Sequence, residues 1–128
     1  MLTKKNILKE YSISAKQEAT IHSFLEKLKE YNSHTNLVGR STLENPWISH
    51  ILDSVQIVHH LKNKKQTILD MGTGAGFPGA VLSIVGCKSV TLADSNGKKI
   101  NFLKLTKKEL LLSFKIILGR VERLSGLK

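Results

Sequence analysis

Residues 70–79 carry the feature that most limits how this chain can fold. They read Asp-Met-Gly-Thr-Gly-Ala-Gly-Phe-Pro-Gly and follow a short apolar run. Glycine has no Cβ and adopts positive φ at little cost, so closely spaced glycines let the backbone bend sharply and approach a ligand. When a strand is followed by such a loop and then by a helix, the loop forms a ligand site at the carboxyl edge of a parallel sheet. The segment therefore predicts an α/β fold that binds a small molecule in this loop.

The pattern around the loop divides the chain into two zones. Residues 1–64 show only helical periodicity, which predicts an amino-terminal helical extension. Residues 65–128 alternate strand-like and helix-like runs, which predicts a parallel Rossmann-like sheet with right-handed crossovers. The expected order is a short buried strand, a helix, a strand, a helix and a strand, at 67–70, 78–85, 89–94, 97–112 and 114–118. Open parallel sheets usually have more strands, so we expect a partial domain, truncated after the third strand.

Two helices dominate the first zone. Ser14, with Gln17 three residues later, predicts a capping box at the start of one helix. Its buried stripe is expected to be Ile21, Phe24, Leu25, Leu28 and Tyr31. A second helix is expected from Asn45, with Pro46 at its first position. Its apolar face is expected to be Ile48, Ile51, Leu52, Val55, Val58 and Leu61, and a short helix around Ile7 precedes both.

Several ligands compete for the glycine loop. A Walker A loop requires Gly-Lys-Ser/Thr after its glycines, and residues 77–79 are Phe-Pro-Gly, which excludes it. Residues 74–79 formally match the dinucleotide fingerprint G-x-G-x-x-G, but the carboxylate of Asp70 would repel a pyrophosphate. That carboxylate suits the aminoacyl, positively charged methyl donor S-adenosylmethionine, and Asp94 after the next strand can reach its ribose hydroxyls. A nicotinamide-dependent oxidoreductase and a purely structural turn stay as alternatives.

The charge is large and unevenly distributed. The formal net charge is +10, and residues 98–128 carry nine lysines or arginines against two glutamates. Residues 67–97, around the glycine loop, carry one lysine against two aspartates. A strong basic excess indicates a polyanionic partner, with a solvated lysine-rich surface as the structural alternative.

The remaining composition narrows the class of protein. No apolar run is long enough to cross a bilayer and the first residues do not resemble a signal peptide, so we expect a cytoplasmic protein. The single cysteine, Cys87, lies among apolar residues and is expected to be a buried thiol. The five histidines lack metal-ligand spacing, and no Cys-His or Ser-His-Asp arrangement is visible. We therefore expect no metal and leave the catalytic residues unassigned.

Five motifs, taken together, resemble one known family. They are Asn-Leu-Val-Gly at 36–39, His-Ile-Leu-Asp-Ser at 50–54, the loop at 70–79, Asp-Ser-Asn-Gly-Lys-Lys at 94–99 and Gly-Arg-Val-Glu at 119–122. In this order and spacing they resemble the RsmG (GidB) family, bacterial methyltransferases that act on N7 of a guanine in 16S ribosomal RNA. The resemblance covers the chain from about Tyr11. The block at 50–54 combined with Gly-Phe-Pro-Gly is far more specific than the glycines alone.

The resemblance implies a Rossmann-like methyltransferase fold, S-adenosylmethionine as cofactor and the small ribosomal subunit as partner. It implies cofactor contacts at Gly72, Phe77, Val121 and Glu122. The loop and strand-end residues complete the set of candidate cofactor-binding residues: Asp70, Gly74, Gly76 and Asp94. Arg40 and Arg120 are candidate contacts to RNA or substrate, with a purely exposed surface position as the alternative. His50 and Asp53 lie on one side of a helix, and packing against the loop is their expected role.

Family members continue beyond the motif at 119–122 with further strands that complete the sheet and the methyl-transfer pocket. We therefore expect part of an rRNA methyltransferase, acting as a monomer. A non-catalytic RNA-binding remnant is the alternative from a different class.

Overall fold

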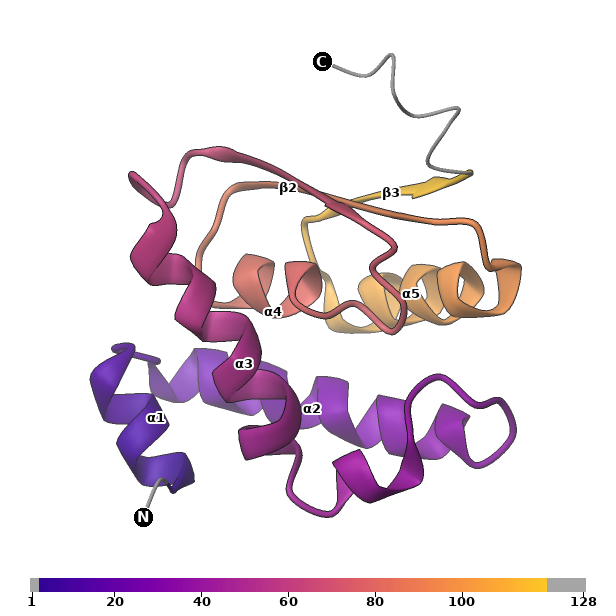
Figure 1. Cartoon of the computed structure of the whole chain (residues 1–128), viewed down its shortest axis with the longest axis horizontal. Coiled ribbons are helices and arrows are strands. Elements are labelled where there is room, and N and C mark those ends of the chain that lie inside the picture. Colours follow the sequence, from indigo (N-terminus) through magenta and orange to yellow (C-terminus); the bar gives the residue numbers. More distant parts are fainter. Residues whose placement is uncertain (1–2, 120–128) are drawn as a thin grey trace.

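The structure, a computed structural model, describes residues 3–119 and has the expected α/β architecture (Figure 1). The helical first part contains α1 (Lys4–Glu10), α2 (Ala15–Asn32), the 3-10 helix η1 (Arg40–Leu43), the π-helix η2 (Trp47–Leu52), α3 (Asp53–Val55) and the 3-10 helix η3 (Gln56–His60). The second part contains β1 (Thr67–Met71), α4 (Gly79–Ile84), β2 (Ser89–Asp94), α5 (Gly97–Leu110) and β3 (Lys115–Leu118).

Side-chain caps explain where the longer helices begin. The Ser14 hydroxyl accepts a hydrogen bond from the backbone N–H of Gln17, and the Gln17 side chain accepts one from the N–H of Ser14. This confirms the predicted capping box, which satisfies N–H groups that have no partner inside the helix. Thr3 and Asn6 form the same reciprocal pair at the start of α1, confirming the short first helix.

The second helix differs from the regular α-helix that its apolar pattern predicts. From Trp47 it runs as a π-helix, then as one α-turn, and ends as a 3-10 helix at His60. The 3-10 end of the segment matches the spacing of its apolar side chains. Val55, Val58 and Leu61 recur every third residue, which is the repeat of a 3-10 helix. In the π-helical part, by contrast, Ile48, Ile51 and Leu52 keep the spacing of an α-helix.

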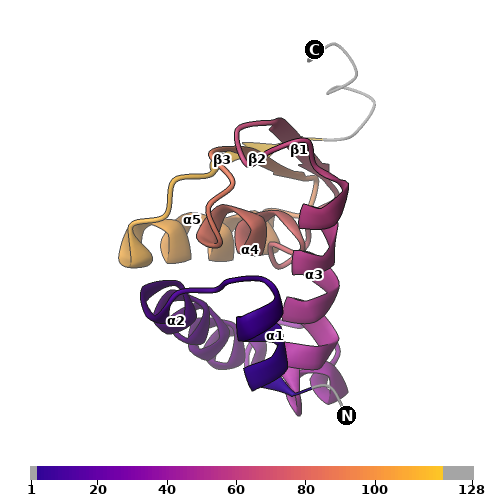
Figure 2. The ribbon, with the colours of Figure 1, turned by 90° about the vertical axis from the view of Figure 1, so that its left-hand side faces the viewer.

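The three strands form one parallel sheet in the order β1-β2-β3. Met71 pairs with Ala93, and Asp94 pairs with Leu118, so the carboxyl ends of all three strands meet at one edge. Figures 1 and 2 show α4 and α5 lying along the same face of this sheet. The order and direction agree with the predicted Rossmann-like topology.

The prediction that the first strand is buried is wrong for one of its faces. Ile68 is partly buried against the core, but Leu69 and Met71, which point the other way, are 38% and 49% exposed. Side chains alternate between the two faces of a strand, and within residues 3–119 the helices cover only one face of the sheet (Figure 2). The apolar run at 67–71 therefore has a partner on a single side.

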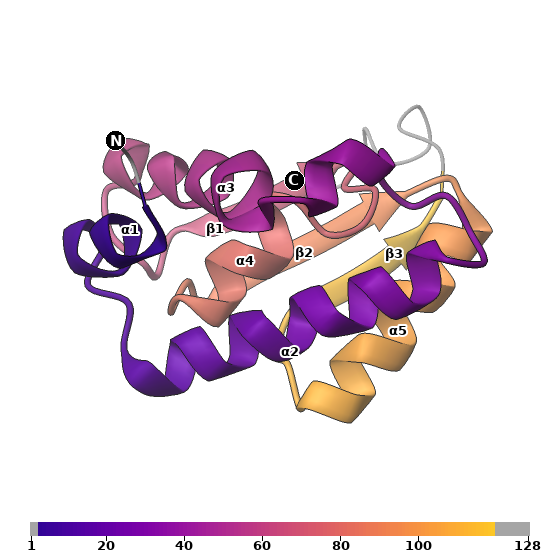
Figure 3. The same ribbon diagram turned by 90° about the horizontal axis from the view of Figure 1, so that it is seen from below.

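α2 packs against α4 and α5, and residues of the first part share one hydrophobic cluster with residues of β1 and β2. Figure 3 shows α2 running diagonally across the molecule, with α4 on one side of it and α5 on the other. Two hydrophobic clusters fill the layers, and each contains residues from before and after position 64. Phe24 of α2, for example, lies edge-on to Phe77 and to Phe102, with ring centroids 5.9 Å apart in each case. The boundary near residue 64 stays a prediction, and packing across it is continuous.

Phe24 tests how strongly the helical part stabilises the rest. Its side chain is fully buried at the meeting point of α2, α5 and the glycine loop. We expect Phe24→Ala to lower the free energy of unfolding by about 3–5 kcal/mol, because it removes buried area and leaves a cavity. Glu26→Ala, at an exposed position of the same helix, is expected to change it by less than about 0.5 kcal/mol. Urea unfolding followed by circular dichroism measures both, and equal effects would contradict this packing.

Candidate cofactor site

Three glycines give the loop after β1 its shape. Gly72, Gly74 and Gly76 have φ angles of +72°, +60° and +104°, a region that other residues rarely adopt. A Cβ on Gly72 or Gly74 would meet no atom within 4 Å, so these two border open space. A Cβ on Gly76 would lie 2.9 Å from side-chain atoms of Ala80 and Leu103. The loop is therefore packed against the protein at Gly76 and open at the other two glycines.

The carboxylate of Asp70 holds the two ends of the loop together. Its Oδ2 atom accepts hydrogen bonds from the hydroxyl of Thr73 at 2.7 Å and from the backbone N–H of Gly79 at 2.9 Å. Gly79 begins α4, so Asp70 ties the end of β1 to the start of that helix. Sequence reasoning missed Thr73, although a hydroxyl inside a glycine loop, three residues after an aspartate, was a usable signal.

Asp94 holds the same loop from the next strand. Its Oδ2 accepts the N–H of Gly74 at 2.8 Å, and its Oδ1 accepts the N–H of Asn96 at 2.8 Å. The register of the parallel strands brings Asp94 to the edge where β1 ends. The two carboxylates predicted from the sequence therefore lie on either side of the loop, as the carboxyl-edge rule for parallel sheets requires.

Burial makes the Asp70 carboxylate less acidic. Loss of hydration raises its pKa above the ordinary range, the hydrogen bonds from Thr73 and Gly79 oppose this, and the nearby charge of Asp94 adds to it. The two hydrogen bonds thus stabilise the charged carboxylate and offset part of the cost of its desolvation. A positively charged ligand group placed beside Asp70 would offset that cost, whereas an anion would increase it.

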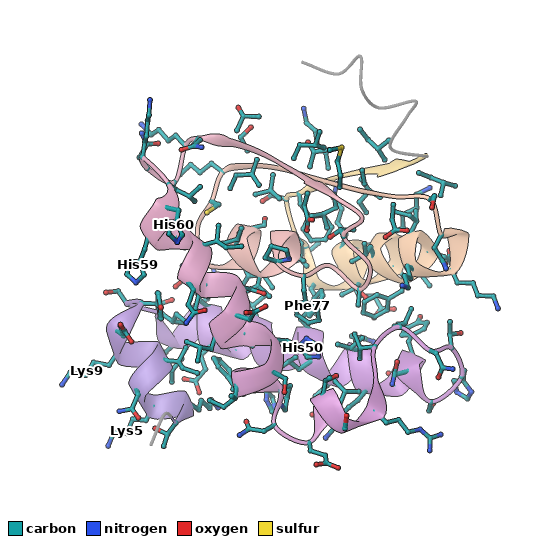
Figure 4. All side chains as sticks on the ribbon, in the orientation of Figure 1. Lys5, Lys9, His50, His59, His60 and Phe77 are labelled. Carbon is teal, nitrogen blue, oxygen red and sulfur yellow. The ribbon has the colours of Figure 1, made fainter. Side chains whose placement is uncertain are left out.

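The imidazole of His50 stacks on Phe77 of the loop (Figure 4). The ring centroids are 4.4 Å apart and the planes differ by 10°. His50 Nε2 lies 2.8 Å from the hydroxyl of Thr42, which itself donates to the carbonyl of Gly39. That hydroxyl therefore accepts from His50, which places the proton of the neutral ring on Nε2. His50 packs against the loop as expected, whereas Asp53 is exposed on α3 and makes no hydrogen bond to the described residues of the loop.

Of the predicted RNA-contact and adenine-contact residues, Arg40 is the one that lies in the part of the chain described by the structure. Arg40 is exposed at the start of η1, beside an open concavity of about 550 Å³ that Lys29 and Glu44 also line. Arg120, Val121 and Glu122 lie outside the described residues. Cys87 is buried, as expected. Within residues 3–119, no three histidine, cysteine, aspartate or glutamate side chains are grouped to hold a metal ion, and no helix is long and apolar enough to cross a membrane.

Comparison with known proteins decides the family. The family described as GidB, rRNA small subunit methyltransferase G, matches residues 17–127. The chain belongs to this family. Ribosomal RNA small subunit methyltransferase G of Orientia tsutsugamushi (strain Boryong) is 42% identical over 93 residues, covering 73% of this chain and 47% of the relative.

Two further curated relatives carry the same name. The protein of Rickettsia prowazekii (strain Madrid E) is 40% identical over 101 residues, covering 79% of this chain and 53% of the relative. That of Cereibacter sphaeroides (strain ATCC 17029 / ATH 2.4.9) is 31% identical over 128 residues, covering 96% of this chain and 62% of the relative. The chain thus spans about half the length of the curated relatives it matches.

Gly79 provides a test of the Asp70 clamp. A Cβ at this position would lie 2.2 Å from Leu92 Cδ2 and 2.8 Å from Asp70 Oδ2. Gly79→Ala is therefore expected to lower the free energy of unfolding by about 2–3 kcal/mol through overpacking. Gly97→Ala is the matched control, because a Cβ there meets no atom within 4 Å and Gly97 begins α5. It is expected to be neutral or to stabilise by up to about 1 kcal/mol. Thermal unfolding of both variants checks the difference.

His50 provides a test by pH. Burial lowers the pKa of its imidazole, and the charge of Asp53 opposes the shift only in part. With a folded-state pKa below the unfolded value, the unfolded chain binds more protons as the pH falls below about 6.5. The contribution of His50 to the free energy of unfolding is therefore fully present above that pH. It decreases as the pH falls toward 5, because the unfolded chain then takes up the proton more readily.

We expect His50→Phe, which preserves an aromatic ring against Phe77, to remove this loss of stability. Asp70, whose pKa is raised, contributes with the opposite sign in both proteins, so the difference between the two curves isolates His50. Urea midpoints between pH 7.5 and 5 provide the measurement. Parallel curves for the two proteins would contradict the burial of a neutral imidazole.

Proposed function

We propose that this chain binds S-adenosylmethionine in the loop at 70–79, and that the protein transfers a methyl group to N7 of a guanine in 16S ribosomal RNA. The observation that carries the proposal is the Asp70 carboxylate, half-buried at the base of a glycine loop that is open at Gly72 and Gly74. Membership of the rRNA small subunit methyltransferase G family supports the same conclusion.

The residues present fit this cofactor. The second oxygen of Asp70, Oδ1, accepts no hydrogen bond from the described part of the chain and can receive the ammonium group of the methionine moiety. Asp94 uses one lone pair of each oxygen for Gly74 and Asn96, which leaves acceptor capacity for ribose hydroxyls. Gly72, Gly76 and Phe77 shape the loop around them, and Val121 and Glu122 are proposed to contact the adenine.

The proposed methyl transfer requires the protein mainly to align the methyl donor with the guanine. Bound S-adenosylmethionine supplies a methyl group activated by its sulfonium, and guanine N7 carries a lone pair in the neutral base. No general base is needed for the attack, so the chain's residues would contribute by holding the cofactor and orienting the guanine. This agrees with a site that contains loop-shaping carboxylates and a stacked His50–Phe77 pair rather than a nucleophile beside a base.

The alternative of a dinucleotide cofactor is less well supported. In dinucleotide-binding folds the pyrophosphate accepts hydrogen bonds from the first N–H groups of the helix after the glycine loop. Here the N–H of Gly79, which begins that helix, already donates to Asp70. A pyrophosphate would have to replace this bond and would then face the Asp70 carboxylate.

Asp70→Asn tests the cofactor assignment. We expect isothermal calorimetry to detect S-adenosylmethionine binding and no NADH binding by the wild-type chain. Asp70→Asn is expected to weaken binding by at least ten-fold, because a neutral amide cannot offset the charge of an ammonium group, while the fold keeps its stability or gains some. Glu30→Gln, an exposed position on α2 with the same change of charge, is the control. NADH binding without S-adenosylmethionine binding would overturn the proposal.

Transfer of labelled methyl from S-adenosylmethionine to undermethylated small ribosomal subunits tests the activity. We expect label in 16S ribosomal RNA at guanine N7, and loss of that label in Asp70→Asn. A chain that binds RNA but never transfers label would favour the non-catalytic RNA-binding alternative, which the basic excess of residues 98–128 motivates.

A further inference from the structure

A second concavity, separate from the cofactor loop, lies between the end of α2 and the start of α5. Its volume is about 340 Å³, within the range of small-ligand pockets. Its lining residues carry side chains that donate hydrogen bonds, and none of them is a carboxylate: His34, Thr35, Asn36, Asn96, Lys98 and Lys99. A pocket with these groups, two of them ammonium groups, has the chemistry to bind an anion.

The wall from residues 34–36 is held in place by backbone hydrogen bonds. The N–H groups of His34 and Thr35 donate to the carbonyl of Tyr31 at 3.1 and 2.9 Å. The buried side chain of Asn32 accepts the N–H groups of Leu37 and Val38 at 2.8 and 3.0 Å. The loop after α2 is therefore closed back onto the helix by four hydrogen bonds, and this wall exists before any ligand arrives.

The opposite wall is held equally firmly. The Asn96 side chain accepts the N–H groups of Lys98 and Lys99 at 3.0 and 3.1 Å. These N–H groups at the start of α5 are thus already used, so anion binding would depend on the lysine side chains. Tyr31 packs on Phe102 of α5 with ring centroids 5.4 Å apart, and this contact joins the two walls.

The lysines at this pocket form no ion pair within the described part of the chain. Two ion pairs occur between side chains of residues 3–119, Lys4 with Glu18 and Lys27 with Glu109, and neither involves the pocket. Lys98 is exposed and Lys99 is half-buried at the pocket wall. Two ammonium groups that form no ion pair with the described residues therefore line one small concavity.

The pocket is linked directly to the cofactor loop. Asp94 accepts the N–H of Gly74 in the loop through one oxygen and the N–H of Asn96 in the pocket wall through the other. Asn96 in turn caps the turn that carries Lys98 and Lys99. One carboxylate thus fixes both the loop at 70–79 and the basic pocket, so an anion in the pocket would be positioned relative to the cofactor.

We propose that this pocket seats a backbone phosphate of the RNA substrate, close to the nucleotide that is presented to the cofactor loop. The inference rests on the proposed function for the identity of the ligand, while the anion site itself rests on the pocket. Phosphate is the shared chemistry of an RNA backbone and of free inorganic phosphate, and the experiment separates these two sources. Binding by Lys98 and Lys99 would be electrostatic and would weaken with salt.

The test compares Lys98→Gln/Lys99→Gln with a control that removes the same charge elsewhere, Lys62→Gln/Lys65→Gln. Lys62 and Lys65 are exposed before β1, at the opposite end of the strands from the pocket. The probe is a fluorescent, guanine-containing single-stranded oligoribonucleotide, followed by anisotropy over a series of salt concentrations. A second probe has the same sequence with uncharged methylphosphonate linkages, and a third is inorganic phosphate, added as a competitor.

We expect the pocket variant to bind the charged oligonucleotide at least five-fold more weakly than the control. We also expect its slope of log affinity against log salt to fall by about 0.7 for each phosphate that the variant no longer neutralises. The methylphosphonate probe should bind both variants equally. If millimolar inorganic phosphate displaces the labelled oligonucleotide as effectively as unlabelled RNA does, the pocket is a free-phosphate site. This result would overturn the RNA assignment.

The outcomes separate this inference from the proposed function. In one outcome, Lys98→Gln/Lys99→Gln binds S-adenosylmethionine as the wild type does and binds RNA as strongly as the control. This result overturns the phosphate pocket and leaves the proposed function standing. Loss of RNA affinity in the pocket variant, in a chain that binds no S-adenosylmethionine, supports the pocket and overturns the proposed function. Circular dichroism of both double variants confirms that they fold.

Discussion

The clamp formed by Asp70 is the interaction on which the rest of the site depends. One carboxylate oxygen accepts from Thr73 inside the loop and from Gly79 at the start of α4, so a single side chain sets where the strand ends, how the loop turns and where the helix begins. The clamp leaves the carboxylate partly desolvated, with a raised pKa. A fold that keeps a charged group in this state gains from a ligand that carries the opposite charge.

The amino-terminal helices are part of this arrangement, because two of their aromatic side chains pack against the loop. The ring of Phe77 stacks on the ring of His50 and forms a T-shaped pair with Phe24. His50 is held by Thr42, which lies in η1, and its segment winds as a π-helix. π-Turns are often found at functional sites, and here the winding carries the imidazole that stacks on the loop. The helical part and the Rossmann-like part therefore form one packed unit around residue 77.

Asp94 extends the organisation from the loop to the surface. Its two oxygens divide between Gly74 in the loop and Asn96 at the start of α5, and Asn96 places two lysines beside the turn after α2. The cofactor loop and the basic pocket thus share one hydrogen-bonded network. Under the proposed function, such a network would relate the position of the methyl donor to that of the RNA phosphate backbone.

The sequence by itself determined the elements and the loop. Periodicity, the cap at Ser14, the glycine spacing and the carboxylates at strand ends are local signals, and the strand at 89–94 and both carboxylates were found from them. The tertiary structure alone decided which face of β1 is exposed, how the segment after Trp47 winds, and that Phe24 packs on both Phe77 and Phe102. These features depend on contacts between segments far apart in the chain. No local pattern encodes such contacts, because they arise only when the layers pack.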